Sequence, residues 1–292
     1  MPSRKSTSKR GAARRKSVAR ARHSSNRSTW IVVTVVVVIG VALVIAARSG
    51  GGASAARSPA PAALVAKVVG VPPSVFEAVG AGSAAPLPAK IAGPPLVKDG
   101  KPRIVFMGAE YCPYCAAERW AVIAALARFG TWSGLERTHS SSFDTLPDTQ
   151  TFSFASAQFH STYVSFEAVE MNTNELGSDG GYKKFQTPTL EQQQLMATYD
   201  APPYVSTKAG GIPFIDFGGR YVISGATYDA GVLHGLSAEH IASDLADPTS
   251  QVSQGAIGAA NGITAAICEL THNEPASVCA SRAIQGLETK LA

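Results

Sequence analysis

The stretch IVFMGAEYCPYCAAERWAVIAALARF, from Ile104 to Phe129, decides the fold of this chain. It opens with a run of apolar residues, a pattern typical of a buried strand. From Trp120 onward the apolar residues recur at helical spacing, and Gly130 stands where a glycine commonly ends a helix. The pattern predicts a strand, a turn and a helix, with the sequence Cys-Pro-Tyr-Cys at residues 112–115 where the helix begins.

This placement gives the two cysteines a redox chemistry. A helix N-terminus has unsatisfied N–H groups and a partial positive charge, and both favour a thiolate. Cys112 is therefore the candidate nucleophile, with a lowered pKa. Cys115 lies on the same side of the turn and is expected to resolve a mixed disulfide at Cys112. Glu118 is a candidate proton acceptor for Cys115, but for this carboxylate we favour a position that faces solvent beside Arg119.

Two other roles of the cysteine pair are a structural disulfide and one half of a zinc site. Zinc would need two further ligands, but the sequence has no second C-x-x-C and no H-x-x-x-H. Its histidines show no ligand spacing either. We therefore expect no metal and no organic cofactor, and we favour redox activity over an inert disulfide.

Strand, C-x-x-C and amphipathic helix together resemble the thioredoxin superfamily. A second segment, GGIPFIDFGGRYVISG at residues 210–225, is similar to the cis-proline loop and the following hairpin of that family. The resemblance implies a cis peptide bond between Ile212 and Pro213 that faces Cys112, with the backbone of Ile212 offered to a substrate peptide. An ordinary trans proline is the alternative. Thr187-Pro188 is the other candidate proline, but it precedes a helix-like run.

The chain from about Val71 to its end also resembles a family of bacterial and archaeal membrane-anchored proteins catalogued as a domain of unknown function. The implied fold class is α/β, an elaborated thioredoxin-like fold in which helices flank a central mixed sheet, after an N-terminal transmembrane helix. The long interval from Cys115 to Pro213 requires an insertion between the C-x-x-C helix and the cis-proline loop.

Residue patterns predict the other elements of this domain. A short helix at 74–79 is expected to start with Ser74 as its cap. Alternating residues predict strands, and we expect the second and third of them to form a hairpin. These strands are 135–139, 151–155 and 163–170, followed by a loop at 172–181 and by helices at 191–199, 237–245 and 251–267.

The first 47 residues predict a membrane anchor. Residues 1–29 form a basic tail with ten Lys or Arg and no acid, which we expect to be disordered and which accounts for the net charge of +5. Residues 30–47 carry no charge, and as a helix of about 27 Å they would cross a hydrocarbon core of about 30 Å. Positive charge before this segment predicts a single-pass protein of the cell membrane, with a cytoplasmic N-terminus and an extracytoplasmic C-terminal domain.

A cleaved signal peptide is the alternative, because Ala53-Ser54-Ala55 resembles a cleavage site. The apolar run is longer than that of most signal peptides, so we favour an uncleaved anchor. Residues 48–70 are rich in small residues and proline and predict a flexible linker. Residues 71–292 would then form the thioredoxin-like extracytoplasmic domain.

A second cysteine pair, Cys268 and Cys279, lies near the end of the chain. An oxidising compartment favours a structural disulfide between two such neighbours. The alternative is a relay that passes electrons to or from Cys112 and Cys115.

These observations predict a membrane-anchored extracytoplasmic thiol-disulfide oxidoreductase that acts on exported proteins through its C-P-Y-C motif. Its partners would be the thiols or disulfides of exported proteins, the lipid bilayer around residues 30–47 and a membrane redox partner. The direction of electron flow stays open. The alternative is a non-catalytic thioredoxin-like binding or assembly module of the cell envelope with a structural disulfide. A nucleic-acid role of the basic tail is a weaker third hypothesis, and we expect no nucleic-acid partner.

Overall fold

The apolar run at Ile104 forms the central strand of a mixed β-sheet. The computed structural model describes residues 57–206 and 211–291. In it β4 (Lys101–Gly108) pairs in parallel with one neighbour, β9 (Ser165–Glu170), and antiparallel with the other, β12 (Phe214–Phe217). The sheet runs in the order β9, β4, β12, β13 (Tyr221–Ser224) and β2 (Ala89–Lys90), and β3 (Val97–Lys98) pairs with the start of β4.

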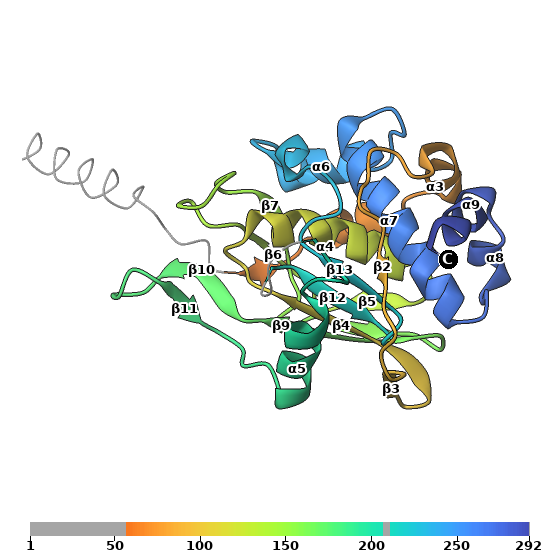
Figure 1. Ribbon diagram of the computed structural model, residues 1–292. Helices are drawn as coiled ribbons and strands as arrows, with labels where there is room; N and C mark the ends of the chain where they lie inside the picture. The colour runs from red at the N-terminus through yellow and green to blue at the C-terminus, as the bar shows by residue number, and fades with distance from the viewer. Residues whose placement is uncertain (1–56, 207–210, 292) are drawn as a thin grey trace, which may run out of the picture. The chain divides into compact units, whose positions relative to one another are not determined.

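Helices cover both faces of this sheet (Figure 1). Successive residues of a strand point to opposite faces. Ile104 and Phe106 accordingly pack with α4 (Pro113–Leu126) and α7 (Gln251–Leu270), whereas Met107 packs with α5 (Leu190–Tyr199). Both faces of β4 are therefore buried, which explains its unbroken apolar sequence.

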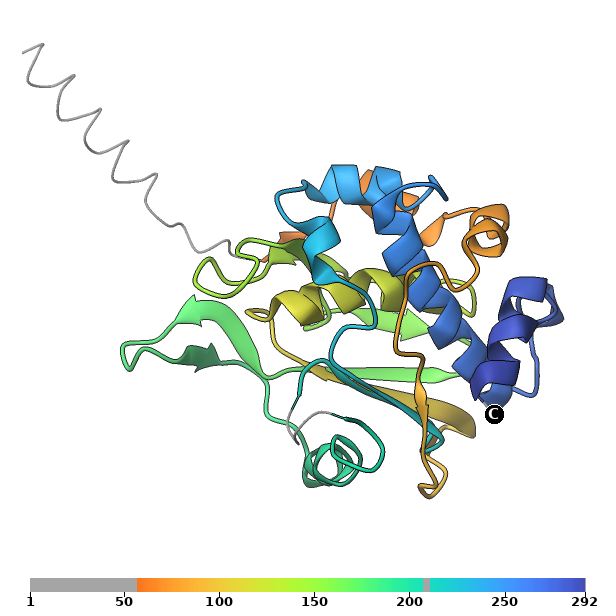
Figure 2. The same cartoon turned by 45° about the horizontal axis from the view of Figure 1, so that its top comes forward.

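The remaining helices lie on the same side of the sheet as α4 and α7, as Figure 2 shows from a second direction. The long helix α7 packs along α4 and leaves almost none of that helix accessible to solvent. These remaining helices are α2 (Ala62–Val69), α3 (Pro73–Val79), the 3-10 helix η1 (Ala230–Leu233), α6 (Ala238–Asp244), α8 (Ala276–Cys279) and α9 (Arg282–Leu291).

The insertion between α4 and the cis-proline loop contains most of the strands outside the central sheet. They form three small antiparallel sheets, and the β10–β11 hairpin extends away from the central sheet in Figures 1 and 2. The three are β1 (Ser58–Pro59) with β6 (Glu136–His139) and β7 (Gln150–Ser153), β5 (Thr131–Ser133) with β8 (Gln158–His160), and β10 (Asn172–Leu176) with β11 (Tyr182–Lys184).

Two predictions about this insertion were wrong. The strands predicted at 151–155 and 163–170 do not form a hairpin, because β7 pairs with β6 and β9 pairs with β4. Residues 172–181 are not all loop, because β10 pairs with β11. The sequence of β10, NTNEL, has no apolar alternation. This segment forms a strand because its backbone pairs with that of β11, and residue patterns do not reveal such pairing.

The prediction of a flexible linker at 48–70 was also wrong for residues 57–70, the part of this segment that the structure describes. These residues contain β1 and α2, whose Leu64 and Val68 lie one turn apart and are buried in the main core. The domain therefore starts before residue 71. The predicted Ser74 cap is wrong as well, since α3 begins at Pro73 and Pro72 precedes it without a side-chain cap.

The predictions for residues 1–29 and 30–47 lie outside the described residues. Within residues 57–206 and 211–291, no single helix is long and apolar enough to span a membrane. One pair, α2 and α3, bent by 54°, passes that test by length and composition.

Several predictions about the C-terminal part were confirmed. Helix α6 has Ser237 as its cap, whose side chain accepts a hydrogen bond from the N–H of His240. Helix α7 was also expected, and Cys268 and Cys279 form a disulfide. The glycines at 255, 258 and 262 within α7 could also be expected to allow close packing against the sheet. Gly258 instead faces the segment after α3, because a Cβ there would lie 2.3 Å from the carbonyl oxygen of Ala81.

A candidate dithiol site at the start of helix α4

The two cysteines of the C-x-x-C segment lie where the turn after β4 enters α4. Cys112 is the N-cap residue, with φ −78° and ψ 122°, and its Sγ accepts a hydrogen bond from the N–H of Cys115 at 3.4 Å. Pro113 occupies the first helical position, where its missing N–H leaves nothing unsatisfied. Cys112 is 5% exposed and Cys115 is fully buried. Both are free thiols, and Cys112 alone borders the solvent.

The two thiols differ in acidity. The thiol of Cys115 donates a hydrogen bond to the Cys112 sulfur, and this bond, together with the N–H groups of Cys115 and Tyr114, lowers the pKa of Cys112 despite burial. Burial raises the pKa of Cys115 well above its usual value, and the hydrogen bond to Cys112 adds to that rise. The first proton to leave the reduced pair therefore leaves from Cys112.

The loop at Ile212 and Pro213 lies against the first cysteine. Their peptide bond is cis, as the resemblance implied, and the carbonyl oxygen of Ile212 accepts a hydrogen bond from the Cys112 thiol at an Sγ–O distance of 3.7 Å. The loop leads directly into β12, in which Phe214 pairs with Met107 of β4. Strand pairing thus brings together residues that are far apart in the sequence.

Glu118 is buried, so the favoured prediction that it faces solvent was wrong. Its two carboxylate oxygens accept hydrogen bonds from the N–H and the hydroxyl of Thr227. Burial raises the pKa of Glu118 to about 7. Among the described residues its hydrogen bonds come from Thr227 and not from either cysteine, so its role as proton acceptor for Cys115 stays a prediction.

An ion pair that the sequence did not indicate lies beside the thiols. Arg119 donates from Nε and Nη2 to the carboxylate of Glu170, at 3.0 and 2.7 Å, and both side chains are fully buried. Nη2 also donates to the carbonyl oxygen of Ala109 at 2.9 Å. Burial lowers the pKa of Arg119, but the negative charges of Glu170, Cys115 and Glu110 together more than offset this, and the pKa lies above its ordinary value. The one indication in the local sequence is that Arg119 follows Cys115 by four residues, which places the two on the same side of a helix.

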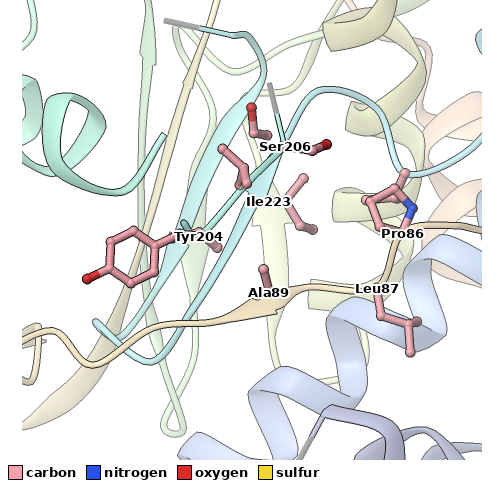
Figure 3. Close-up of a pocket in the computed structure, with 10 residues that line it drawn as sticks. Pro86, Leu87, Ala89, Tyr204, Ser206 and Ile223 are labelled. Carbon is pink, nitrogen blue, oxygen red and sulfur yellow. The ribbon is translucent and has the colours of Figure 1, made fainter. Parts of the chain in front are cut away.

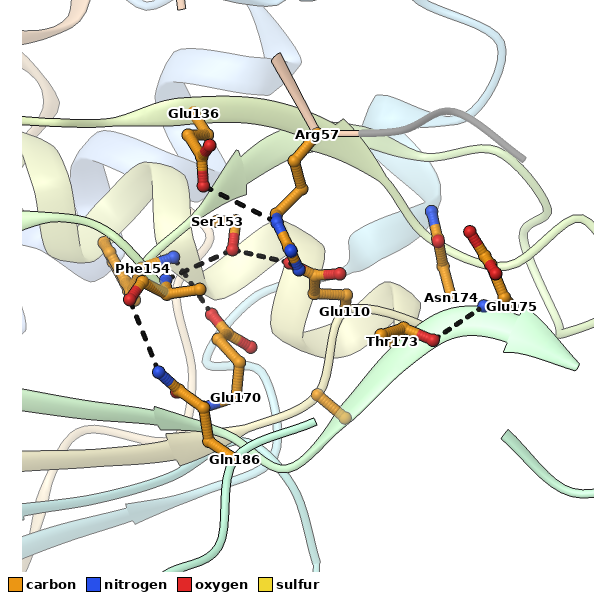
Figure 4. A network of polar contacts seen from close by, with 12 residues as sticks. Arg57, Glu110, Glu136, Ser153, Phe154, Glu170, Thr173, Asn174, Glu175 and Gln186 are labelled. Atoms are coloured by element: carbon orange, nitrogen blue, oxygen red, sulfur yellow. Dashed lines mark hydrogen bonds and ion pairs between the residues drawn. The ribbon is translucent and has the colours of Figure 1, made fainter. Parts of the chain in front are cut away.

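A second acidic side chain, Glu110, is held close to the same turn (Figure 4). Its Oε1 accepts hydrogen bonds from Arg57 at 3.0 Å and from the hydroxyl of Ser153 at 2.6 Å. The N–H of Phe154 donates to Glu170 at 3.2 Å. Ser153 at the end of β7 and Phe154 directly after it therefore each donate a hydrogen bond to one of the two carboxylates.

Aromatic residues border the site. The ring of Tyr111 stacks on that of Tyr182 in the β10–β11 hairpin, with centroids 4.0 Å apart and planes inclined by 4°. Burial, followed by the charge of Cys112, raises the pKa of Tyr111 to about 12. Tyr114 is 46% exposed, so of the two tyrosines that flank Cys112 only this one presents much of its ring to solvent.

A cavity of about 130 Å³ lies at the outer edge of β13 (Figure 3). Its walls are mainly apolar, with four hydroxyl-bearing side chains among them. Thr227 in the wall also donates a hydrogen bond to Glu118. The cavity therefore lies next to the carboxylate whose pKa is raised. It is lined by Pro86, Leu87, Ala89, Tyr204, Val205, Ser206, Val222, Ile223, Ser224 and Thr227.

The described domain is thus a mixed α/β domain with a thiol pair at a helix N-terminus. The family described as Domain of unknown function (DUF929) matches residues 88–178, a segment that contains both thiols but ends before Ile212. No curated protein and no solved structure was found to match the chain. In the part of the chain that the structure describes, no group of three or more His, Cys, Asp or Glu could hold a metal ion.

Proposed function

We propose that this chain is a thioredoxin-like thiol-disulfide oxidoreductase that is anchored in the cell membrane by residues 30–47 and acts on exported proteins. One observation carries the proposal. The sulfur of Cys112 caps helix α4, has a lowered pKa and faces the cis Ile212–Pro213 loop, while Cys115 behind it is buried with a raised pKa. A nucleophile that borders the solvent and a protonated thiol behind it are what stepwise exchange needs.

The sheet supports the thioredoxin-like part of the proposal. The C-x-x-C helix follows β4, a parallel strand lies on one side of β4, and the hairpin after the cis proline lies on the other. Of this arrangement, the sequence resemblance implied the helix after the strand, the hairpin after the proline and a mixed sheet between helices. The three small sheets lie outside the order β9-β4-β12-β13, and β9 is the strand of the inserted segment that joins it.

The exchange proceeds in two steps. The thiolate of Cys112 attacks one sulfur of a partner disulfide, forms a mixed disulfide and releases the other partner sulfur as a thiolate. Cys115 then loses its proton and attacks the Cys112 sulfur, so the partner leaves with both of its sulfurs reduced. Two electrons pass from the cysteine pair to the partner, and the reverse sequence oxidises a partner dithiol.

A trapping experiment tests the proposal. In full-length Cys115→Ser the second step is blocked, so mixed disulfides between Cys112 and exported proteins should accumulate and disappear on reduction. The control is Cys112→Ser, Cys115→Ser, in which none should form. Absence of mixed disulfides in the single variant, with Cys112 still accessible to an alkylating reagent, contradicts the proposal.

One observation favours the second candidate, a non-catalytic binding or assembly module. Cys112 is only 5% exposed, which suits a protected structural pair as well as a nucleophile. The reduction potential separates the two candidates. A value below about −300 mV marks a structural disulfide, and a value between about −120 and −270 mV marks an exchange enzyme.

A further inference from the structure

Arg119 is a buried cation beside the thiols, and the exchange steps above do not use it. It lies one helical turn after Cys115 and is fully buried. Nε and Nη2 are satisfied by Glu170 and Ala109, but Nη1 has no hydrogen-bond partner among the described residues. Burying a guanidinium with an unsatisfied N–H is costly, so packing alone does not explain an arginine here.

The peptide groups of Ala109 connect Arg119 to both cysteines. The carbonyl oxygen of Ala109 accepts hydrogen bonds from Nη2 of Arg119 at 2.9 Å and from the N–H of Cys112 at 3.3 Å. The N–H of Ala109 is a donor to the sulfur of Cys115. The guanidinium therefore fixes the turn that carries the thiols, and its charge acts on them across a space without bulk water.

The charge of Arg119 favours the thiolate. It lowers the pKa of Cys112, adding to the effect of the hydrogen bonds to its sulfur, and it opposes the rise that burial causes at Cys115. Glu170 and, to a smaller extent, Glu110 interact with Arg119 as counter-ions. Tyr111, the other titratable group close to Cys112, is neutral below its raised pKa of about 12.

We propose that Arg119 is a positioning residue that sets the reduction potential of the Cys112–Cys115 pair, with Glu170 as the counter-ion that moderates it. The proposal rests on the exchange function proposed above. Reduction of the disulfide takes up two electrons and, when Cys112 stays a thiolate, one proton that ends on Cys115. A nearby cation stabilises this charged product and not the neutral disulfide, so Arg119 makes the pair more oxidising and Glu170 makes it less so.

Two single variants of the full chain have opposite expected effects. Arg119→Met should shift the equilibrium with glutathione about tenfold toward the disulfide form, which lowers the reduction potential by about 30 mV, and should raise the pKa of Cys112. Glu170→Gln should raise the potential and lower that pKa further. A purely structural effect would disturb the same turn in both variants and move both potentials in one direction.

Further variants keep the test decisive if Arg119→Met does not fold, because that change leaves Glu170 buried without its partner. The double variant Arg119→Met, Glu170→Gln removes both charges, and its potential should lie about 30 mV below that of Glu170→Gln. Arg128→Met is the matched control. Arg128 follows the same helix and contacts Asn261 and Thr264, so its loss should leave the potential unchanged.

The measurements are equilibration with glutathione and the pH dependence of Cys112 alkylation, both with the Cys268–Cys279 disulfide intact. Equal potentials in the double variant and Glu170→Gln, or shifts of one sign in both single variants, overturn the role of Arg119. A wild-type pair that never equilibrates with glutathione overturns the proposed function instead. The two failures are therefore distinct.

Discussion

Replacing Glu118 with glutamine should make the protein more stable above pH 7 and weaken the dependence of its stability on pH. The carboxyl is fully buried, and burial raises its pKa from 4.5 to about 7. Because the folded protein holds this proton more tightly than the unfolded chain, its contribution is fully present below pH 4.5. It is lost as the pH rises to about 7 and stays lost above that.

The loss follows from the two pKa values. At about 1.4 kcal/mol for each tenfold change in proton affinity, a rise from 4.5 to about 7 corresponds to about 3 kcal/mol. Asp216 adds a separate contribution, because burial raises its pKa from 3.8 to about 6. The Glu118→Gln variant removes the contribution of Glu118 and leaves that of Asp216. The Asp216 contribution is lost at a pH about one unit lower.

Urea unfolding of the wild type and the variant at pH 5, 6, 7 and 8 measures the difference. We expect the variant to gain up to about 3 kcal/mol relative to the wild type between pH 5 and 8, since glutamine can still accept a hydrogen bond from the N–H of Thr227. Glu239→Gln, which changes an exposed carboxylate on α6, serves as the control for the loss of one surface charge. A Glu118→Gln variant that follows the wild-type pH curve refutes the reasoning.

Three further predictions concern packing and the disulfide. Trp120→Ala empties the position of the largest fully buried side chain and removes its hydrogen bond to Gln150, so chemical denaturation should show a loss of about 3–5 kcal/mol. Replacing Cys268 and Cys279 together by serine should lower stability by about 2–3 kcal/mol, while trapping through the first cysteine pair continues. Gly258→Ala should destabilise the protein by about 1–3 kcal/mol, because the new Cβ would lie 2.3 Å from a backbone oxygen. Gly286→Ala in α9 has free space for its Cβ and should stabilise the protein by about 0.5–1 kcal/mol. Equal effects of the two variants would contradict this.

The strand, the turn and the start of helix α4 could be predicted because their signals are local. Four apolar residues, a C-P-Y-C turn and a run of helical spacing lie within 26 residues. The proline at position 213 was found in the same way, from the short strands and paired glycines that follow it. What the sequence did not indicate are contacts between distant segments, such as the pairing of β9 with β4 and of β6 with β7.

Glu118 and Arg119 show why the polar part of the site was harder to predict. An amphipathic helix normally presents its polar residues to solvent, so both were expected on an exposed face. Helix α4 has no such face, because the sheet, α7 and β7 surround it and every residue from Cys115 to Leu126 is buried. Each polar side chain then needs a partner from another segment, and those partners are 51 residues away at Glu170 and 109 away at Thr227.

The insertion between α4 and the cis-proline loop has an electrostatic consequence for the thiols. Its strand β9 supplies Glu170, the counter-ion of Arg119, and the end of β7 supplies the N–H of Phe154 to the same carboxylate. Without these segments the guanidinium would be hydrated, and in water its effect on a thiolate at the same distance would be several-fold weaker. The insertion therefore lets a cation one helical turn from Cys115 act on the pair, independently of any surface that it offers to a partner.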